Sequence, residues 1–514
     1  MEQKKRALVS VYDKTNIVEF CKYLTEYGYE IVSTGGTAKV LSEGGVDVIP
    51  VSALTGTEEC LGGIIKTLHP KVYAGLLADK EKQAHMQTLA EMDVTPIDML
   101  VVNLTPFKEA IMRKNCSVEE AIDNIDVGGP SMLRAAAKNY TNVTVIVDPK
   151  DYQRVLCELA IGRISTEFKK YLQYKVFAHT AVYDSVISNY LANQLGVKFP
   201  EIATFAYRKT QEMRYGENPH QRSAFYIDEF VRPGSLPGAK QLWGKELSYN
   251  NISDTEDALC LIKEFEEPTV VISKHANPVG VGSATTVFEA FIKAYEADPD
   301  STYGGVVAAN VIIDARTAEA ISKIYVEIII AVGFTPEAMS ILTRKENIRI
   351  LELPDIRVKR EADSLDTRKV YGGLLVQEYD DVLFNEEDLK IVTKRAPTVS
   401  EMKALLFNWK VVKHTKSDAI VIGVADQTKG IGMGQTNRFW AVEQALSHAG
   451  ELANGAVMAS DAFLASVQCV EAAHKAGIRA IIQPCGYIDD KSVIEACDKY
   501  DIAMVSVGMR HFKR

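Results

Sequence analysis

Short apolar runs alternate with helix-like patterns through the first part of the chain. Residues 7–11 form an apolar run, and Ile17, Cys21 and Leu24 then recur at helical spacing before Gly28. Further strands are predicted at 30–33, 47–51, 96–102 and 143–147, with a helix at 38–43. Alternation of this kind predicts a mostly parallel sheet covered by helices.

A second α/β region is predicted after a linker at 196–206. Strand-like runs such as 270–272 and 419–424 again alternate with helical patterns, and we find no short-period repeat or low-complexity tract. Because a single core rarely grows beyond about 250–300 residues, the chain is expected to form several domains, and this long region two subdomains. We therefore predict a first domain at 1–197 and a second region at 198–514.

The stretch at residues 270–282 combines a predicted strand with candidate chemistry. Its apolar run suits a strand buried on both faces, and Lys274 and His275 follow directly. Asn277, Pro278 and the glycines after them are typical of a turn. At the carboxyl end of a strand, the Lys274 ammonium would disfavour protonation of His275 and keep the imidazole able to accept a proton. The alternative is a surface turn that carries two polar residues by chance.

Composition and charge narrow the class of protein. The 514 residues are 47% hydrophobic and 25% charged, with a formal charge of −10 and a pI of about 5.6, as in ordinary soluble proteins. This acidity argues against nucleic acid as the main partner but allows a local phosphate pocket. The eight cysteines lack C-x-x-C spacing, which favours free thiols in a reducing compartment. Without a signal-peptide core or a membrane-spanning apolar run, we expect a cytoplasmic protein with no membrane partner.

Two segments of the first domain are candidate anion sites. The segment Ser33-Thr34-Gly35-Gly36-Thr37 lies between a predicted strand and a helix, where backbone N–H groups and hydroxyls attract phosphate. An ordinary capped turn is the alternative. Residues 126–130 lead into a helix with Arg134 and Lys138 on one face, which is either a solvated basic face or a second anion-gathering edge. Lys66 could hold a phosphate or polarise a carbonyl.

Polar stretches in the second region are also candidates for ligand binding. Arg214 could make a bidentate contact to phosphate, and Gln435 and Arg438 follow a glycine-rich run. A zinc site is not predicted, because Cys485 has no second cysteine at the required spacing. The chain also lacks a Walker sequence and a G-x-G-x-x-G after its first strand.

The chain resembles one protein family through a series of ordered stretches: SVYDK, STGGTA, KTLHP, VVNL, NIDVGGP, LRAAAKN, RYGENPHQ, GKELSYNN, KHANP, GQTNR, SDAF and IIQPCG. It is the family of bifunctional purine biosynthesis enzymes with AICAR transformylase and IMP cyclohydrolase activities. The likeness extends from about residue 5 to the C-terminus. Any one stretch is unspecific, whereas the ordered set is highly specific.

The resemblance implies the last two steps of IMP synthesis. The second region would transfer a formyl group from 10-formyltetrahydrofolate to AICAR, and the first domain would close the product, FAICAR, to IMP with loss of water. It also implies a methylglyoxal-synthase-like first domain and two cytidine-deaminase-like subdomains without zinc. Only small-molecule substrates, no metal for the chemistry and a homodimer with transformylase sites across its interface are expected.

The resemblance further implies roles for individual residues. His275 would remove a proton from the AICAR amine as the amine attacks the formyl carbon, and Lys274 would stabilise the developing charge. In the first domain, Lys66, Asp126 and Lys138 match catalytic positions. Substrate-binding candidates there are Ser10, Lys14, Ser33, Thr34, Gly35, Gly36, Thr37, Thr67 and Asn103. In the second region they are Arg214, Tyr215, Asp418, Gln435, Arg438, Phe463, Arg510 and Phe512.

Several positions depart from the family's usual residues. Ile64 and Thr105 stand where arginine and tyrosine are common, which would slow ring closure. The other departures are Tyr12 for a small hydroxyl residue, Asp418 for asparagine, Leu464 and Gln468 in a stretch expected to contact folate, and Arg514 for a final histidine. Two alternatives therefore stay open: a transformylase with weak or lost cyclohydrolase activity, and a nucleotide-binding regulatory protein without turnover.

Overall fold

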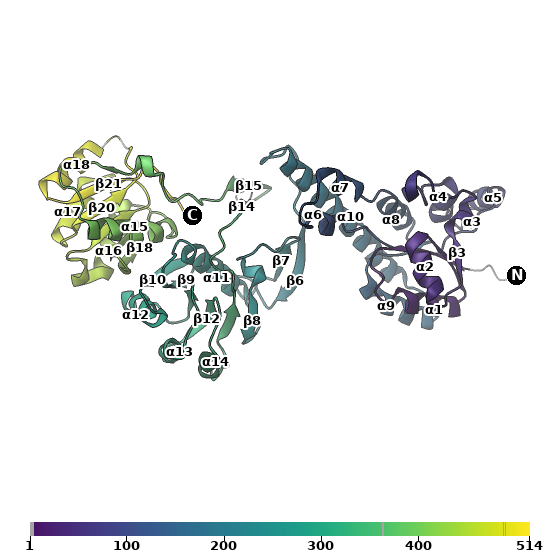
Figure 1. Ribbon diagram of the computed structural model, residues 1–514, viewed down its shortest axis with the longest axis horizontal. Helices are drawn as coiled ribbons and strands as arrows, with labels where there is room; N and C mark the ends of the chain where they lie inside the picture. The colour runs from purple at the N-terminus through teal and green to yellow at the C-terminus, as the bar shows by residue number, and fades with distance from the viewer. Residues whose placement is uncertain (1–4, 362–363, 487, 489) are drawn as a thin grey trace. The chain divides into compact units, whose positions relative to one another are not determined.

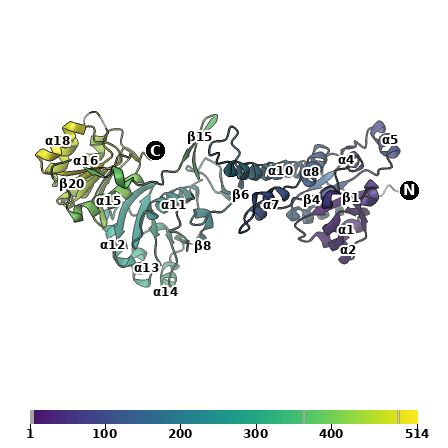
Figure 2. The same cartoon turned by 45° about the horizontal axis from the view of Figure 1, so that its top comes forward.

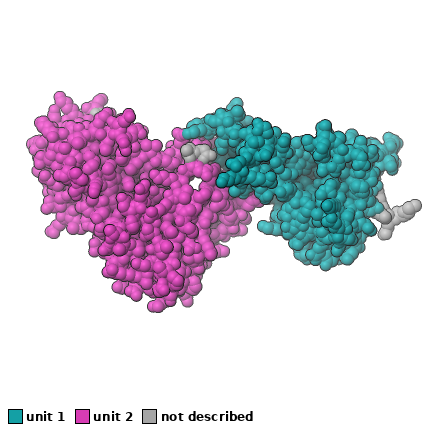
Figure 3. All heavy atoms as spheres, in the orientation of Figure 1, with its two compact units in different colours: residues 1–206 teal, residues 207–514 magenta. Residues whose placement is uncertain are grey.

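The computed structural model describes residues 5–361, 364–486, 488 and 490–514. The chain divides into two compact units, Met1–Ala206 and Tyr207–Arg514, which are coloured teal and magenta in Figure 3. Each unit is built on its own main β-sheet. Within the described residues, no helix is both long and apolar enough to span a membrane.

Unit 1, the purple to blue part of the ribbon in Figures 1 and 2, is built on a five-stranded sheet. The strand order is β3-β2-β1-β4-β5, and every pair is parallel. Its strands are β1 (Lys5–Val11), β2 (Tyr29–Ser33), β3 (Val48–Pro50), β4 (Met99–Asn103) and β5 (Thr144–Ile146). Its helices are α1 (Ile17–Glu26), α2 (Gly35–Glu43), α3 (Val51–Thr55), α4 (Pro70–Leu77), α5 (Gln83–Glu91), α6 (Phe107–Ile111), α7 (Val118–Asp123), α8 (Gly128–Lys138), α9 (Tyr152–Ala160) and α10 (Thr166–Gln194). The predicted parallel sheet is confirmed.

The sheet of unit 1 is buried on both faces. Because side chains alternate along a strand, Ala7 and Val9 of β1 join one core with residues of α1 and α9, such as Phe20. Leu8 joins the opposite core, together with Leu133 of α8. Burial on both sides explains the continuous apolar runs of these strands. It leaves the loops at the strand ends as the places where polar side chains can gather.

Unit 2 contains a mixed sheet of twelve strands in the order β16-β21-β20-β19-β17-β18-β10-β9-β11-β12-β13-β8. Its first half comprises β8 (Lys240–Trp243), α11 (Tyr249–Ile262), β9 (Thr269–Lys274), β10 (Asn277–Ser283), α12 (Val287–Ala297), β11 (Gly305–Ala309), α13 (Ala315–Ser322), β12 (Val326–Ala331), α14 (Pro336–Leu342) and β13 (Arg349–Glu352). Its second half comprises β16 (Lys390–Ile391), α15 (Val399–Lys413), β17 (Ile420–Val424), β18 (Gln427–Gly432), α16 (Arg438–Ala449), β19 (Val457–Ser460), α17 (Val467–Lys475), β20 (Ala480–Gln483), α18 (Asp490–Lys499) and β21 (Ala503–Ser506).

The two halves of this sheet have the same organisation. Outwards from the central β10–β18 pair, each half contributes an antiparallel hairpin partner, β9 or β17, and then an antiparallel strand, β11 or β19. Two parallel strands and an antiparallel edge strand complete each half. The sequence pattern indicated two subdomains but did not reveal that they share one continuous sheet.

Two small hairpins lie outside the twelve-stranded sheet. One pairs β6 (Tyr207–Met213) with β7 (Ser223–Asp228), and the other pairs β14 (Leu365–Val370) with β15 (Gly373–Glu378). The β14–β15 hairpin stands apart from the sheet in both ribbon views (Figures 1 and 2). Its tip residue Tyr371 is fully exposed.

The glycines at 280 and 282 belong to a strand, so the turn predicted at 277–282 is wrong. β10 spans Asn277–Ser283, and a Cβ at Gly280 or Gly282 would lie 2.0 Å or 2.4 Å from a main-chain carbonyl of α12. Gly430 and Gly432 of β18 face α16 in the same way, at 2.2 Å and 2.0 Å. The glycines therefore let a helix lie directly on each strand.

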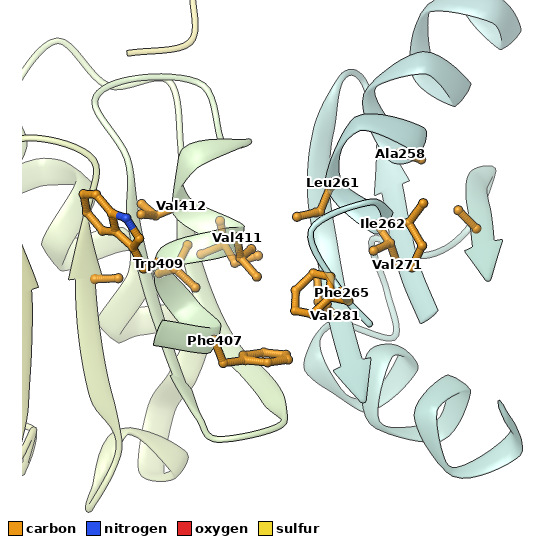
Figure 4. Close-up of a cluster of buried hydrophobic side chains, with 14 of the residues drawn as sticks. Ala258, Leu261, Ile262, Phe265, Val271, Val281, Phe407, Trp409, Val411 and Val412 are labelled. Atoms are coloured by element: carbon orange, nitrogen blue, oxygen red, sulfur yellow. The ribbon is translucent and has the colours of Figure 1, made fainter. Parts of the chain in front are cut away.

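An apolar cluster joins the two halves of unit 2. Leu261, Phe265, Phe407 and Val411 face one another between α11 and α15 (Figure 4). The rings of Phe265 and Phe407 have centroids 5.3 Å apart. Trp409, also on α15, is fully buried, and its ring packs against His511. This packing fixes the segment after α15 relative to the β9–β10 hairpin.

Candidate functional site

Lys274 and His275 lie at the turn of the β9–β10 hairpin. The sequence suggested that this pair lies at the carboxyl edge of a parallel sheet. It does not, because β9 is antiparallel to both β10 and β11. Lys274 pairs with Asn277, which leaves His275 and Ala276 as a two-residue loop with φ angles of 52° and 60°. His275 is exposed, and Lys274 Nζ donates to the carbonyl of Tyr303 at 2.6 Å.

Two side chains outside the loop hold its backbone. Asp254 Oδ1 of α11 accepts a hydrogen bond from the Ala276 N–H at 3.0 Å. Asn277 Nδ2 donates to the His275 carbonyl at 3.1 Å, and Asn277 Oδ1 accepts from the Lys416 N–H at 3.0 Å. Burial raises the pKa of Asp254, although the backbone N–H groups of the loop oppose that rise. The loop is therefore tied both to α11 and to the segment after α15.

The segment after α15 carries a buried ion-pair cluster around Arg438. The guanidinium at the start of α16 donates to Asp418 Oδ1 at 2.8 Å, to the Ala419 carbonyl at 3.1 Å and to Asp461. Asp461 is fully buried, and burial raises its pKa, while the charge of Arg438 opposes the rise. The Gln435 carbonyl accepts from the Asp418 N–H at 3.0 Å.

The C-terminal tail runs beside this cluster. His511 N–H donates to the Asp461 carbonyl, and Ser417 N–H donates to the Lys513 carbonyl, both at 2.9 Å. The Arg510 guanidinium lies 4.6 Å from the centroid of the Phe512 ring. Phe463 follows Asp461 by two positions and is half-buried. The structure thus brings the predicted residues Asp418, Gln435, Arg438, Phe463, Arg510 and Phe512 into one region, joined to the His275 loop through Asn277.

Arg214 and Tyr215 lie in the loop that follows β6. Arg214 is exposed. The carbonyl of Glu217 in this loop accepts from Asn250 Nδ2 at 3.5 Å, at the start of α11. The loop is therefore positioned by the same helix that carries Asp254.

In unit 1, several predicted residues gather where β1 and β2 end. Ser10 Oγ lies 2.8 Å from Thr34 Oγ1, and Thr34 precedes α2. A Cβ at Gly35 would lie 3.0 Å from Lys66 Nζ, so this ammonium lies over the start of α2. Lys66 also pairs with Glu59 at 3.3 Å. A cation, a hydroxyl pair and free helix N–H groups together can bind a phosphate.

Two other hydroxyls of this segment are used within the fold. Ser33 Oγ donates to the Val9 carbonyl at 2.7 Å, and Thr37 Oγ1 both accepts from the Val11 N–H and donates to the Val11 carbonyl. Both side chains are buried. Their contacts tie β2 and α2 to β1 and thereby support the turn containing Gly35 and Gly36.

The loops after β1 and β4 are joined by predicted site residues. Asn103 Oδ1 accepts from the N–H groups of Tyr12 and Asp13 at 2.6 Å and 2.8 Å. Asp126 accepts from the Thr105 N–H at 3.3 Å and from the Gly129 N–H at 2.8 Å, so it also caps the start of α8. The Thr67 hydroxyl also lies close to the start of α8, because a Cβ added at Gly128 would lie 3.2 Å from it.

The two other predicted cations of unit 1, Lys14 and Lys138, make no hydrogen bond or ion pair with the cluster at the start of α2 within the described part of the chain. Lys14 is exposed and donates to the main-chain carbonyls of Val11 and Tyr12 at 3.3 Å and 3.2 Å. Lys138 is exposed in the last turn of α8. This helix has 11 residues, so its two ends are about 15 Å apart. Lys138 and Asp126 therefore lie at opposite ends of α8.

Two departures from the family pattern differ in their exposure. Ile64 is 75% exposed, in the loop before Lys66. Leu464 is fully buried in the core of the second half. Gln468 is exposed at the start of α17.

Asp254, Tyr303 and Asn277 were not identified as site residues from the sequence. Asp254 and Tyr303 contact the His275 loop across 22 and 29 positions of the chain, so no local spacing marks them. Among the residues that the structure describes, no group of three or more His, Cys, Asp or Glu side chains is placed to hold a metal ion.

Comparison with known proteins identifies the family. The AICARFT/IMPCHase bienzyme family matches residues 136–448, and the MGS-like domain family matches residues 16–131. A protein named bifunctional purine biosynthesis protein PurH from Ruminiclostridium cellulolyticum is 55% identical over 99% of both chains. Proteins of the same name from Acetivibrio thermocellus and Thermoanaerobacter sp. are 55% and 52% identical, again over 99% of both chains. These full-length bifunctional relatives favour an enzyme with both activities over the two alternatives. The chain therefore belongs to the AICARFT/IMPCHase bienzyme family, with an MGS-like N-terminal domain, and catalyses the last two steps of IMP synthesis.

Proposed function

We propose that formyl transfer takes place at the β9–β10 turn, with His275 as the general base. The AICAR amine is a poor nucleophile because its lone pair is delocalised into the ring. A neutral His275 would take the amine proton as the nitrogen attacks the formyl carbon. The Lys274 ammonium, held by the Tyr303 carbonyl, would stabilise the charge that develops on the formyl oxygen. The observation that carries this proposal is the exposed imidazole, presented on a loop held from both sides.

The AICAR pocket of this proposal lies between the loop and the C-terminal tail. Arg438 would donate to acceptor groups of the substrate, and the Phe512 ring would stack on its imidazole. Arg510 would add a second cation beside that ring. The other binding residues of the proposal are Arg214, Tyr215, Asp418, Gln435 and Phe463.

For ring closure, we propose that FAICAR binds where β1, β2 and β4 end in unit 1. Its phosphate would lie at the start of α2, contacted by Thr34, Gly35, Gly36 and Lys66. Ser10, Lys14, Ser33, Thr37, Thr67 and Asn103 would complete or support this pocket. Asp126 and Lys66 would assist proton transfer during loss of water, and Lys138 is assigned a catalytic role by the family resemblance alone.

The proposal places cyclohydrolase activity in residues 1–197 and transformylase activity in residues 198–514, with each half of the second region a cytidine-deaminase-like subdomain. We propose 10-formyltetrahydrofolate as the formyl donor, with no metal needed for the chemistry, no nucleic acid or membrane partner, and a cytoplasmic location. These assignments follow from the reaction that the family performs and from its small-molecule substrates.

We also propose that the chain works as a homodimer. The β14–β15 hairpin exposes Tyr371 and Leu375, which are 109% and 59% exposed, on a two-stranded sheet of its own. A hairpin this small is marginally stable alone, and packing against a second copy would bury its apolar residues. Size-exclusion chromatography with light scattering tests this, and a monomer at micromolar concentration would contradict it.

One assay tests the central proposal. The purified protein is mixed with AICAR and 10-formyltetrahydrofolate, and the end product is identified. The His275→Asn variant should lose formyl transfer, while FAICAR supplied directly should still be closed to IMP, because that reaction is assigned to the other unit. Formyl transfer at the parent rate by this variant would show that His275 is not the base.

A further inference from the structure

The loop that presents His275 has an unusual backbone. His275 and Ala276 both have φ angles in the left-handed region, at 52° and 60°. Asn, Asp and Gly adopt this region readily, whereas alanine has no side-chain hydrogen bond to compensate for the steric cost. Two-residue hairpins often need this geometry, but usually with residues such as Asn-Gly. Something outside the loop must therefore stabilise it.

The second half of unit 2 provides an internal comparison. Its β17–β18 hairpin also closes with a two-residue loop, because Val424 pairs with Gln427. Neither Ala425 nor Asp426 in that loop has a positive φ. The corresponding hairpin of the second half is thus closed without left-handed residues. The strained form occurs in the half that carries the Lys-His pair.

Asp254 is the group that contacts the strained loop from α11. Its Oδ1 accepts from the Ala276 N–H at 3.0 Å, and its carboxylate also interacts with the His275 N–H. Asn277 binds the His275 carbonyl from the other side. The Asp254 carboxylate at the Ala276 N–H and the Asn277 amide at the His275 carbonyl together stabilise the left-handed conformation.

We propose that Asp254 is a positioning residue for formyl transfer, which holds the His275 loop in its left-handed form so that the imidazole faces the substrate. This inference rests on the proposed role of His275 as the base. Asp254 itself touches neither reacting group. Its loss would let the loop relax toward the form seen at Ala425 and Asp426, and the imidazole would turn away from the amine.

The test compares formyl transfer by Asp254→Ala, Asp254→Asn and Ser253→Ala variants. Asp254→Ala should lower kcat by about 10- to 100-fold, the cost expected for a misplaced catalytic group, with little change in KM for AICAR. Asp254→Asn keeps an acceptor oxygen and should retain most of the rate. Ser253 is exposed on the same helix turn, so its variant controls for disturbance of α11.

A second substitution separates positioning from general stability. Ala276→Gly removes the steric cost of the left-handed loop, so it should restore part of the lost kcat when combined with Asp254→Ala. Closure of FAICAR should be unchanged in all variants. Parent kcat in Asp254→Ala, or a loss that glycine does not relieve and that accompanies a lower melting temperature, would overturn the inference.

The His275→Asn variant in the same assay distinguishes two failures. If His275→Asn is inactive and Asp254→Ala has the parent rate, only the positioning role is wrong. If His275→Asn keeps the parent rate, the assignment of the base is wrong and the positioning role falls with it.

Discussion

Asp418 and Arg438 form an ion pair in the second half of unit 2, with Asp418 Oδ1 2.8 Å from the Arg438 guanidinium. The same guanidinium is bound to Asp461. Two carboxylates thus surround one cation that is only 8% exposed. The cation assigned to substrate binding is held by acceptors of the protein itself.

This pairing predicts that Asp418 weakens AICAR binding. In Asp418→Asn, the acceptor oxygen is kept, one negative charge is lost and an amide donor is gained. We expect KM for AICAR to fall by about tenfold, equivalent to about 1.4 kcal/mol, as measured by steady-state kinetics. Asp426→Asn is the matched control, because Asp426 follows the other end of β17 and pairs with Lys293 instead of Arg438. An unchanged or higher KM in Asp418→Asn would contradict the prediction.

A buried polar cluster between the halves predicts acid lability. Glu264 Oε1 accepts from Lys413 Nζ at 2.8 Å and from His414 Nε2 at 2.9 Å. Burial alone would raise the pKa of Glu264, but the hydrogen bonds and charges of His414 and Lys413 lower it to about 2. Burial lowers the pKa of His414 below 6.5, although Glu264 opposes this shift.

Both pKa values are lowered in the folded protein, so both groups make the free energy of unfolding decrease as the pH falls. His414 has a depressed pKa when folded, so its contribution is complete above pH 6.5 and is lost as the pH falls below that value. The Glu264 contribution is complete above pH 4.5 and is lost as the pH falls toward 2. We expect the free energy of unfolding, measured in urea, to fall steadily on acidification.

Two variants separate these contributions. His414→Gln should flatten the loss of stability below about pH 6.5, because glutamine does not titrate there. Glu264→Gln should lower the free energy of unfolding at neutral pH by about 3 kcal/mol, since it leaves Lys413 buried without its counter-charge. If His414→Gln keeps the parent pH profile, another group causes the acid lability.

The close approach of helices to β10 and β18 predicts that their glycines cannot be replaced. Gly282→Ala would place a methyl group 2.4 Å from a carbonyl of α12, and Gly432→Ala would place one 2.0 Å from a carbonyl of α16. Each should cost more than about 2 kcal/mol in thermal or chemical unfolding. Gly333→Ala is the control, because the nearest atom would lie at 3.6 Å. Equal stabilities of the three variants would refute this packing.

Thr105 offers a test of ring closure in unit 1. Its N–H donates to Asp126, a bond that does not depend on the side chain. Thr105→Tyr should therefore leave the loop intact and supply the phenol common in the family, raising the cyclohydrolase rate by up to about tenfold. The transformylase rate of the same protein serves as the control. A slower cyclohydrolase would show that this chain closes FAICAR without a phenol at position 105.

The parallel sheet of unit 1 could be predicted because its strands are continuous apolar runs, whose periodicity is a local property. The β9–β10 hairpin could not, since Asn277, Pro278 and the glycines after them are typical of a turn when read locally. Only the packing of α12 on Gly280 and Gly282 explains why they form a strand. Tertiary contact overrode the local preference at this point.

In the candidate site, too, residues within one stretch could be predicted from the sequence, whereas contacts between distant stretches could not. Lys274 and His275 could be identified from their own stretch and from the ordered motifs around it. Asp254 could not, because its contact with the loop joins residues far apart in the sequence. Ser33 and Thr37 were predicted as ligand donors, yet their hydroxyls bind the backbone of β1, which no single stretch reveals.

The pairing of β10 with β18 joins the two halves of unit 2 through equivalent strands. Gly282 lies opposite Gln427 there in an antiparallel pair, and the Val281 N–H donates to Thr428 Oγ1 at 2.9 Å. Two identical copies related by a twofold axis would meet through the same strand pair. Unit 2 therefore has within one polypeptide the arrangement that a symmetric dimer would have, yet the histidine lies in one half and the buried arginine in the other.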